Sequence, residues 1–264
     1  MTRIPLLAAL LLSACVSGRE RSFTGSTPAD PVVREFLGIS AADSVDFIRW
    51  NLELEEKRFS LSCNYGRGKP NTNGFYGGGK WVRLAGILGE NDREVYLEHG
   101  NHRLSFAKLN TNLLHVLNAS KEMLTGTGGW SYTLNREGEQ QREPLDHYSA
   151  ASFADSVVFQ GRTPCLPGSR GCYKQKWLLV LQENPASYFL KGTIVGSDER
   201  LLGVRGTWSA QRNRKGQLIF RLNDVAGKTV HFLMPATNII LLADEDGNPL
   251  VGNEDFSFTL NRRG

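Results

Sequence analysis

The sequence lacks both a long apolar run and a block of charge of one sign. Its longest apolar run, residues 4–12, is far shorter than the roughly 18 residues of a membrane-spanning helix. Its 31 basic and 27 acidic residues are interspersed, so no basic patch for nucleic acid stands out. At 40% hydrophobic and 22% charged residues, the 264-residue chain has the composition of a folded protein with one or two domains.

The sequence also lacks the common catalytic motifs. It contains no Gly-x-Ser-x-Gly elbow, no His-Glu-x-x-His pair and no phosphate-binding Gly-x-x-x-x-Gly-Lys loop. The glycine-rich residues 74–80 lead into Trp81 on an expected strand, whereas a nucleotide loop leads into a helix. The carboxylates Asp43, Glu94 and Asp224 have no partner at a spacing suited to acid–base catalysis. We therefore expect a protein that is not an enzyme and has no cofactor.

The N-terminus has the pattern of an export signal. A basic start, Met1–Arg3, is followed by the apolar run and then by Leu12-Ser13-Ala14-Cys15. This tetrad resembles the lipobox of bacterial lipoproteins, in which the cysteine is acylated, with palmitate among the chains, and becomes the first mature residue. The alternative is an ordinary signal peptide with an incidental cysteine. The expected signal peptide is 1–14, and the expected lipidation site is Cys15.

A lipid on Cys15 makes a membrane the expected first partner. In lipoproteins of this kind, a residue other than Asp after the cysteine, here Val16, favours the outer membrane, so we expect anchoring there with the protein facing the periplasm. Residues 15–33 are mostly polar and contain Gly and Pro, which is typical of a flexible tether.

The rest of the chain contains an internal duplication. The segment Trp130–Arg136 recurs as Phe256–Arg262, with five of seven positions identical and the other two aromatic. Shorter matches follow in the same order, such as Gly79-Lys-Trp81 with Gly206-Thr-Trp208. Phe36-Leu-Gly38 aligns with Phe159-Gln-Gly161 if a short insertion is allowed. We predict two homologous modules, 34–145 and 146–264, joined by the charged segment 137–146.

Both modules have the period-two alternation of strands with one buried face. Ile48–Glu55 alternates apolar and polar residues, and turn signals such as Gly77–Gly79 and Arg214–Gly216 separate such runs. Seven or so short strands in each module favour a small closed barrel, because closure leaves no exposed edge. The expected fold is all-β, with two tandem antiparallel barrels. Weak helical patterns at 30–36 and 148–155 are expected to precede the modules.

Three cysteines besides Cys15 need an explanation. Cys165 and Cys172 enclose a turn-forming hexapeptide, and in an exported protein this favours a local disulfide. A soft-metal or redox pair is the alternative. Cys63 is expected to be buried in a strand. His99 and His102 flank a Gly-Asn turn. They could bind a metal, but histidines of a solvent-exposed hairpin have the same pattern. We therefore predict no metal site.

Several of these residues together resemble a known family. The second module contains Phe159, Gly161, Pro164-Cys165, Gly206, Trp208, Leu241–Asp244, Gly247-Asn248 and Phe258–Leu260 in the order found in the N-terminal domain of NlpE-type copper-resistance lipoproteins. The resemblance implies small barrels like reduced lipocalins, tethered to the outer membrane and involved in envelope stress signalling. The family's Cys-x-x-Cys is spread here to Cys165 and Cys172, and Ser40–Ser44 stands at that place in the first module.

The sequence thus predicts a non-enzymatic envelope lipoprotein that binds or senses, with an envelope protein as its partner and no nucleic acid. Two alternatives remain open. One is a lipocalin-like carrier of a small apolar ligand, and the other is copper or metal handling through Cys165 and Cys172.

Overall fold

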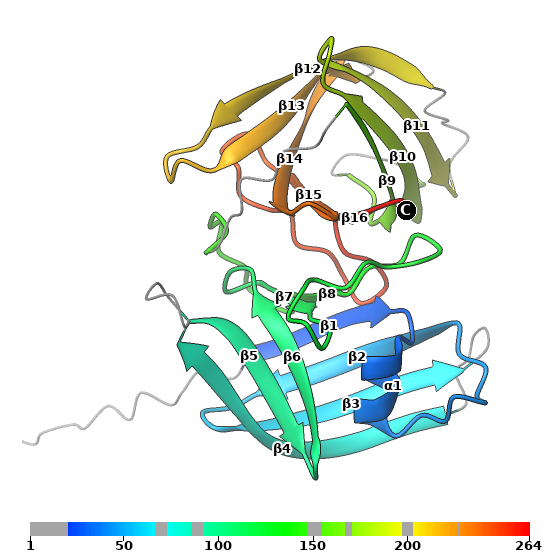
Figure 1. Cartoon of the computed structure of the whole chain (residues 1–264), viewed down its shortest axis with the longest axis vertical. Coiled ribbons are helices and arrows are strands. Elements are labelled where there is room, and N and C mark those ends of the chain that lie inside the picture. The colour runs from blue at the N-terminus through cyan, green and yellow to red at the C-terminus, as the bar shows by residue number, and fades with distance from the viewer. Residues whose placement is uncertain are drawn as a thin grey trace, which may run out of the picture.

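A computed structural model places residues 21–66, 73–85, 92–146, 155–166, 171–196, 203–225 and 227–264, and only these are described below. They form two closed antiparallel barrels, one after the other along the chain (Figure 1). The all-β fold and the two tandem barrels predicted from the sequence are confirmed. No helix among these residues has the length and apolarity that crossing a membrane would require.

The first barrel consists of eight strands and one helix. In chain order its elements are β1 (Arg21–Thr27), α1 (Pro31–Leu37), β2 (Phe47–Leu54), β3 (Arg58–Gly66), β4 (Asn73–Ala85), β5 (Asp92–His99), β6 (His102–Lys108), β7 (Leu113–Val116) and β8 (Thr133–Arg136). Each strand pairs with the next, and β8 pairs with β1 to close the barrel.

The second barrel repeats this order of strands, and its described residues include no helix. Its strands are β9 (Ser156–Thr163), β10 (Lys174–Gln182), β11 (Ser187–Val195), β12 (Val204–Arg212), β13 (Leu218–Val225), β14 (Lys228–Ala236), β15 (Ile239–Ala243) and β16 (Thr259–Arg262). Closure again joins the last strand to the first, with Asn261 opposite Gln160.

Alternation along the strands creates the two interiors. On β2, Trp50 and Leu52 are almost fully buried, whereas Asn51 between them is exposed. On β10, Trp177 and Leu179 point inward in the same way. Each barrel therefore has its own apolar cluster, because the inward faces of most of its strands are shielded from water.

Helix α1 belongs to the first barrel's core. Asp30 caps its N-terminus by accepting a hydrogen bond from the Val32 N–H at 3.1 Å, and Gly38 ends it in the left-handed conformation at φ 65°. Seven residues are too few for a stable isolated helix, so packing must hold it. Val33 and Phe36 supply that packing by joining the barrel's apolar cluster.

The structure changes two details of the predicted organisation and does not test a third. The first barrel begins at Arg21, within the stretch 15–33 that was expected to be tether, because residues 21–27 are needed to pair with both β2 and β8. The helix predicted at 30–36 forms, but it lies between β1 and β2 and does not precede the module. The second helical pattern, 148–155, lies almost wholly outside the described residues.

The glycine run Gly77–Gly79 is not the predicted turn but the middle of β4. A Cβ atom on Gly79 would lie 2.0 Å from the carbonyl oxygen of Glu98, so this close approach of β4 to β5 requires glycine. A Cβ on Gly77 would collide with the ring of Phe75. Here glycine marks close packing inside the barrel.

The two barrels also align differently at their start. Gly25 lies against Leu134 in the first barrel as Gly161 lies against Leu260 in the second. The counterpart of Phe159-Gln-Gly161 is therefore Phe23-Thr-Gly25, and the predicted alignment with Phe36-Leu-Gly38 is wrong. The correspondence is shifted because the module begins with β1, which lies within the stretch expected to be tether.

Candidate functional site

The segment after the first strand differs between the two barrels. The Thr27 hydroxyl donates to Pro28 O at 3.0 Å, and the Thr163 hydroxyl donates to Pro164 O at 2.8 Å, so these positions correspond. From here the first barrel continues into α1, and the second continues into the loop of Cys165 and Cys172. Ser40–Ser44 lies in the same connection of the first barrel, between α1 and β2, so the expected correspondence with the cysteine loop agrees with the order of the elements.

Cys165 and Cys172 form a disulfide, with their Cα atoms 6.0 Å apart. Both sulfur atoms are engaged in this bond, so the pair offers no thiolate ligand to a metal in this state. Cys63 is free and buried, and burial raises the pKa of its thiol well above the usual value. Cys15 and the rest of 1–20 lie outside the described residues.

His99 and His102 contact other side chains and backbone groups of the first barrel. His99 packs edge-on against Phe75 and Phe36, and its Nδ1 lies 2.9 Å from Gly78 O. His102 lies 3.6 Å from Glu35. Among the described residues, no three His, Cys, Asp or Glu side chains gather as they would around a metal ion.

The carboxylates singled out from the sequence also stay apart. Glu94 forms an ion pair with Lys121, and the backbone oxygen of Asp43 accepts from Arg34 at 3.2 Å. The side chain of Asp224 lies outside what the structure describes.

A symmetric polar arrangement lies where the two barrels meet. It is built from the repeated segments that end in β8 and β16. The hydroxyl oxygens of Ser131 and Ser257 are 2.5 Å apart, and the two residues are 126 positions apart in the sequence. Thr133 faces Thr259 at 2.8 Å with the same separation. Equivalent residues thus contact each other, as across a two-fold axis.

Two asparagines complete this symmetric contact. The Gly252 N–H donates to Asn135 Oδ1 at 2.9 Å, and the Gly126 N–H donates to Asn261 Oδ1, also at 2.9 Å. Both asparagine side chains also donate to backbone oxygens of the other barrel, Asn135 to Asn253 and Asn261 to Trp130. The two side chains are at most 1% exposed, so their bonds replace those that water would make.

A row of four aromatic side chains crosses the same contact. Trp130 stacks on Phe256 with ring centroids 5.3 Å apart, and Phe47 stacks on Trp130 at 4.9 Å. On the other side, Tyr173 meets Phe256 edge-on at 6.0 Å. Phe47 and Tyr173 thus flank the central pair on either side, Phe47 by stacking and Tyr173 edge-on.

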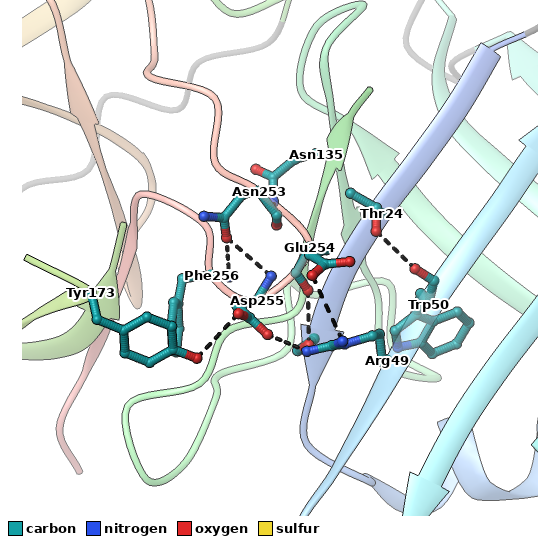
Figure 2. Close-up of polar contacts among 10 residues, drawn as sticks. Thr24, Arg49, Trp50, Asn135, Tyr173, Asn253, Glu254, Asp255 and Phe256 are labelled. Carbon is teal, nitrogen blue, oxygen red and sulfur yellow. Dashed lines mark hydrogen bonds and ion pairs between the residues drawn. The ribbon is translucent and has the colours of Figure 1, made fainter. Parts of the chain in front are cut away.

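A cluster of charged residues lies beside the aromatic row (Figure 2). The guanidinium of Arg49, on β2, contacts Asp255 and lies 3.7 Å from Glu254. The hydroxyl of Tyr173 donates to the other oxygen of Asp255 at 3.1 Å. Asp255 therefore connects β2 of the first barrel with the residue that follows Cys172 in the second.

His115 extends the polar contact into the first barrel. It is fully buried, with Nε2 2.9 Å from Leu124 O and Nδ1 2.9 Å from the Thr133 hydroxyl. Because a carbonyl only accepts, Nε2 carries the proton and Nδ1 accepts from Thr133. Burial lowers the pKa of His115 to about 4, so the ring is neutral near pH 7.

An apolar cluster between the barrels completes their contact. Leu109 and Leu113 from the first barrel and Leu145 from the linker pack against the outer face of β13–β15. The members from the second barrel are Ile219, Leu233, Ile239, Leu241 and Ala243. The amide of Gln217 also donates to Leu145 O at 2.7 Å, which fixes the linker to the second barrel.

One feature of the repeated segments indicates this contact. Ser131, Thr133 and Asn135 alternate with apolar residues, and that alternation predicts side chains facing water. Instead they are buried against their own repeats. The feature that indicates the contact is their identity between the two copies, because solvent-facing positions are free to differ.

A separate cleft opens at one end of the second barrel. It has a volume of about 470 Å³ and is formed by three segments: the β12–β13 hairpin, the turn after β15 and the linker. Its lining residues are Pro144, Gln211, Arg212, Asn213, Arg214, Lys215, Ile219, Glu245, Asp246 and Asn248.

The barrel interiors are occupied by the chain's own side chains where they are described. In the first barrel, Phe23, Leu54 and Trp81 line a cavity of about 10 Å³, the space of about one water molecule.

No family model matches the chain, and no curated protein matches it. Among solved structures, the chain is similar to the crystal structure of the Cpx pathway activator NlpE from Escherichia coli, at 12% sequence identity and a TM-score of 0.29. The match covers 88% of this chain and 90% of that one. At such an identity and TM-score, it carries no argument about what this chain does.

Proposed function

We propose that this chain is an exported lipoprotein, held at the outer membrane by lipid on Cys15, whose two barrels act together as a non-enzymatic binding or sensing unit. The observation that carries the proposal is the position of the Leu12–Cys15 tetrad. Only residues 16–20 lie between Cys15 and the start of β1, so a lipid there would hold the first barrel near the bilayer.

The disulfide of the second barrel supports export. Bonds of this kind form and persist in oxidising compartments such as the periplasm, and they are rare in the cytosol. The contact between the barrels supports their action as one unit, because symmetric hydrogen bonds and a shared apolar cluster join them.

The packed centre of the first barrel, as far as its residues are described, favours binding at the surface over carriage of an apolar ligand inside. A carrier needs an internal space of several hundred Å³, whereas side chains such as Trp50 and Phe106 occupy the first barrel's centre. This observation weighs against the lipocalin-like alternative.

Mass spectrometry of the protein extracted from membranes tests the anchor. We expect a mature chain that starts at Cys15 and carries acyl chains, and we expect the Cys15→Ala variant to keep residues 1–14 and to carry no lipid. Recovery of the unprocessed wild-type chain from the cytosol would contradict the proposal.

A further inference from the structure

The cleft of the second barrel lies on the side of the molecule where the tether begins. Arg21, the first residue of β1, lines the small cavity of the first barrel together with Thr111. The backbone N–H of Thr111 donates to Glu143 at 2.7 Å, and the next residue, Pro144, lines the cleft. In Figure 1, the start of β1 and the β12–β13 hairpin accordingly lie on the same side, at the left.

A lipid on Cys15 would keep this side close to a membrane. A fully extended chain advances at most about 3.6 Å per residue, so six steps from Cys15 to Arg21 reach about 20 Å. That distance is comparable to the length of one barrel strand. The cleft would then remain within reach of lipid headgroups.

The positively and the negatively charged residues of the cleft lie on different segments of the chain. The hairpin contributes Arg212, Arg214 and Lys215, and the turn after β15 contributes Glu245 and Asp246. Within the described part of the chain, no ion pair joins the hairpin's three cations to the turn's two carboxylates. The cleft thus presents one cationic and one anionic side.

The two turns that carry these charges are held in place by their own hydrogen bonds. Asn213 Oδ1 accepts from the backbone N–H groups of Lys215 and Gln217 at 3.0 and 2.9 Å. Asp244 Oδ1 accepts from those of Asp246 and Asn248 at 3.1 and 2.8 Å. The positions of both turns are therefore set before any ligand arrives, which lowers the entropic cost of binding.

We propose that this cleft binds the phosphoethanolamine headgroup of a phospholipid, with Arg214 and Lys215 at the phosphate and Glu245 and Asp246 at the primary ammonium. A guanidinium and an ammonium form charge-assisted hydrogen bonds to phosphate oxygens, and carboxylates accept such bonds from an ammonium group. The inference rests on the proposed lipid anchor, because the tether is what brings the cleft to a bilayer.

The proposal predicts a preference among lipids. An ethanolamine headgroup has three ammonium N–H donors for the two carboxylates, whereas a choline headgroup has none. Phosphatidylglycerol has the phosphate but no cation. If the basic hairpin were attracted to membranes only by their negative charge, the amount of bound protein would instead increase with the fraction of anionic lipid.

The test is co-sedimentation of the unlipidated mature chain, residues 15–264 with Cys15→Ala, with lipid vesicles. This chain contains all described residues but neither the lipid nor the apolar leader, so binding reports the protein surface alone. We expect at least fivefold more protein bound to vesicles of phosphatidylcholine with phosphatidylethanolamine than to phosphatidylcholine alone. Free glycerophosphoethanolamine should compete.

Two matched variants make the test specific. Arg214→Glu with Lys215→Glu should abolish the preference for phosphatidylethanolamine. Lys176→Glu with Lys191→Glu makes the same charge change at exposed positions on β10 and β11, and it should leave the preference intact. Circular dichroism confirms that both variants are folded.

Any of four results would overturn the proposal: no binding to vesicles, equal binding to both neutral lipids, binding that follows phosphatidylglycerol alone, or equal loss in both variants. Binding of free glycerophosphoethanolamine without binding to vesicles would also overturn it, because the cleft would then not face a membrane. Mass spectrometry of the wild-type N-terminus tests the anchor separately, so failure of the anchor can be distinguished from failure of the headgroup site.

Discussion

Thr133 and Thr259 meet hydroxyl to hydroxyl, 2.8 Å apart and both almost fully buried, at the contact between the two barrels. They are the same residue in two copies of one sequence segment. Because this pair and its neighbours are buried and paired, the contact can be tested through the stability of the protein.

Removal of Asn135 should weaken the contact between the barrels. The Asn135→Ala variant leaves the Gly252 N–H without its acceptor in a buried site, and this costs about 1–3 kcal/mol. Asn261→Ala should have a similar effect because it leaves Gly126 N–H unpaired. Chemical denaturation measures both.

The matched control is Asn51→Ala, on the exposed face of β2, where we expect a change of less than about 0.5 kcal/mol. If Asn135→Ala and Asn51→Ala have the same stability, the symmetric hydrogen bonds do not contribute as described.

Acid should destabilise the protein through His115. The pKa of this residue is about 4 in the folded chain, whereas an unfolded histidine has a pKa near 6.5. Between these values the unfolded state binds more protons, so the free energy of unfolding falls as pH decreases from about 6.5 to 4. The full effect is of the order of 3 kcal/mol.

Denaturation at several pH values checks this, with His115→Leu as the comparison, since Leu241 occupies the matching place in the second barrel. The variant should lack this part of the pH dependence. Identical slopes in both proteins would show that His115 is not the group responsible.

Reduction of the disulfide should destabilise the second barrel. Opening a loop with a sequence separation of 7 costs about 2.5 kcal/mol in the chain-entropy model. We expect a lower unfolding midpoint in the presence of a thiol reductant. The variant with Cys165→Ala and Cys172→Ala should have the lower midpoint and no response to the reductant; a full response in this variant would implicate another cysteine.

Substitution of Gly79 should strain the first barrel. In Gly79→Ala the new methyl group would lie 2.0 Å from Glu98 O, and backbone must move to relieve the overlap. We expect a loss of about 1–3 kcal/mol in thermal or chemical unfolding.

Gly74→Ala, on the same strand, meets only the end of the Tyr76 ring at 3.2 Å and should be nearly neutral. Equal effects of the two substitutions would mean that strand propensity, and not the close approach of β4 to β5, determines the cost.

Much of the fold, including two closed barrels, was predictable from local patterns, but the strand that closes the first barrel was not. Alternation such as Trp50–Leu52–Leu54 predicts strands with one buried face, and the repeat predicts two modules. β1 escaped prediction because its segment, Arg21–Thr27, is polar and small, and it is stabilised by pairing with distant strands. The glycine run of β4 was misread because glycine serves both turns and close packing.

The contact between the barrels was harder to predict than the barrels. The polar residues Ser131, Thr133 and Asn135 carry no sign of burial in a single copy, since a strand with one wet face has the same pattern. The cleft depends on turns from distant parts of the chain, Asn213–Gln217 and Asp244–Asn248, whose approach follows only from the closed second barrel.

The near two-fold arrangement inside one polypeptide also frees its halves to diverge. In a dimer of identical subunits, every residue beside the two-fold axis is present in both subunits. A buried histidine at this contact would therefore have to be accommodated twice. Here His115 is matched by Leu241, and helix α1 by a disulfide loop. A fused pair of barrels can thus keep the geometry of a homodimer while each half acquires its own chemistry.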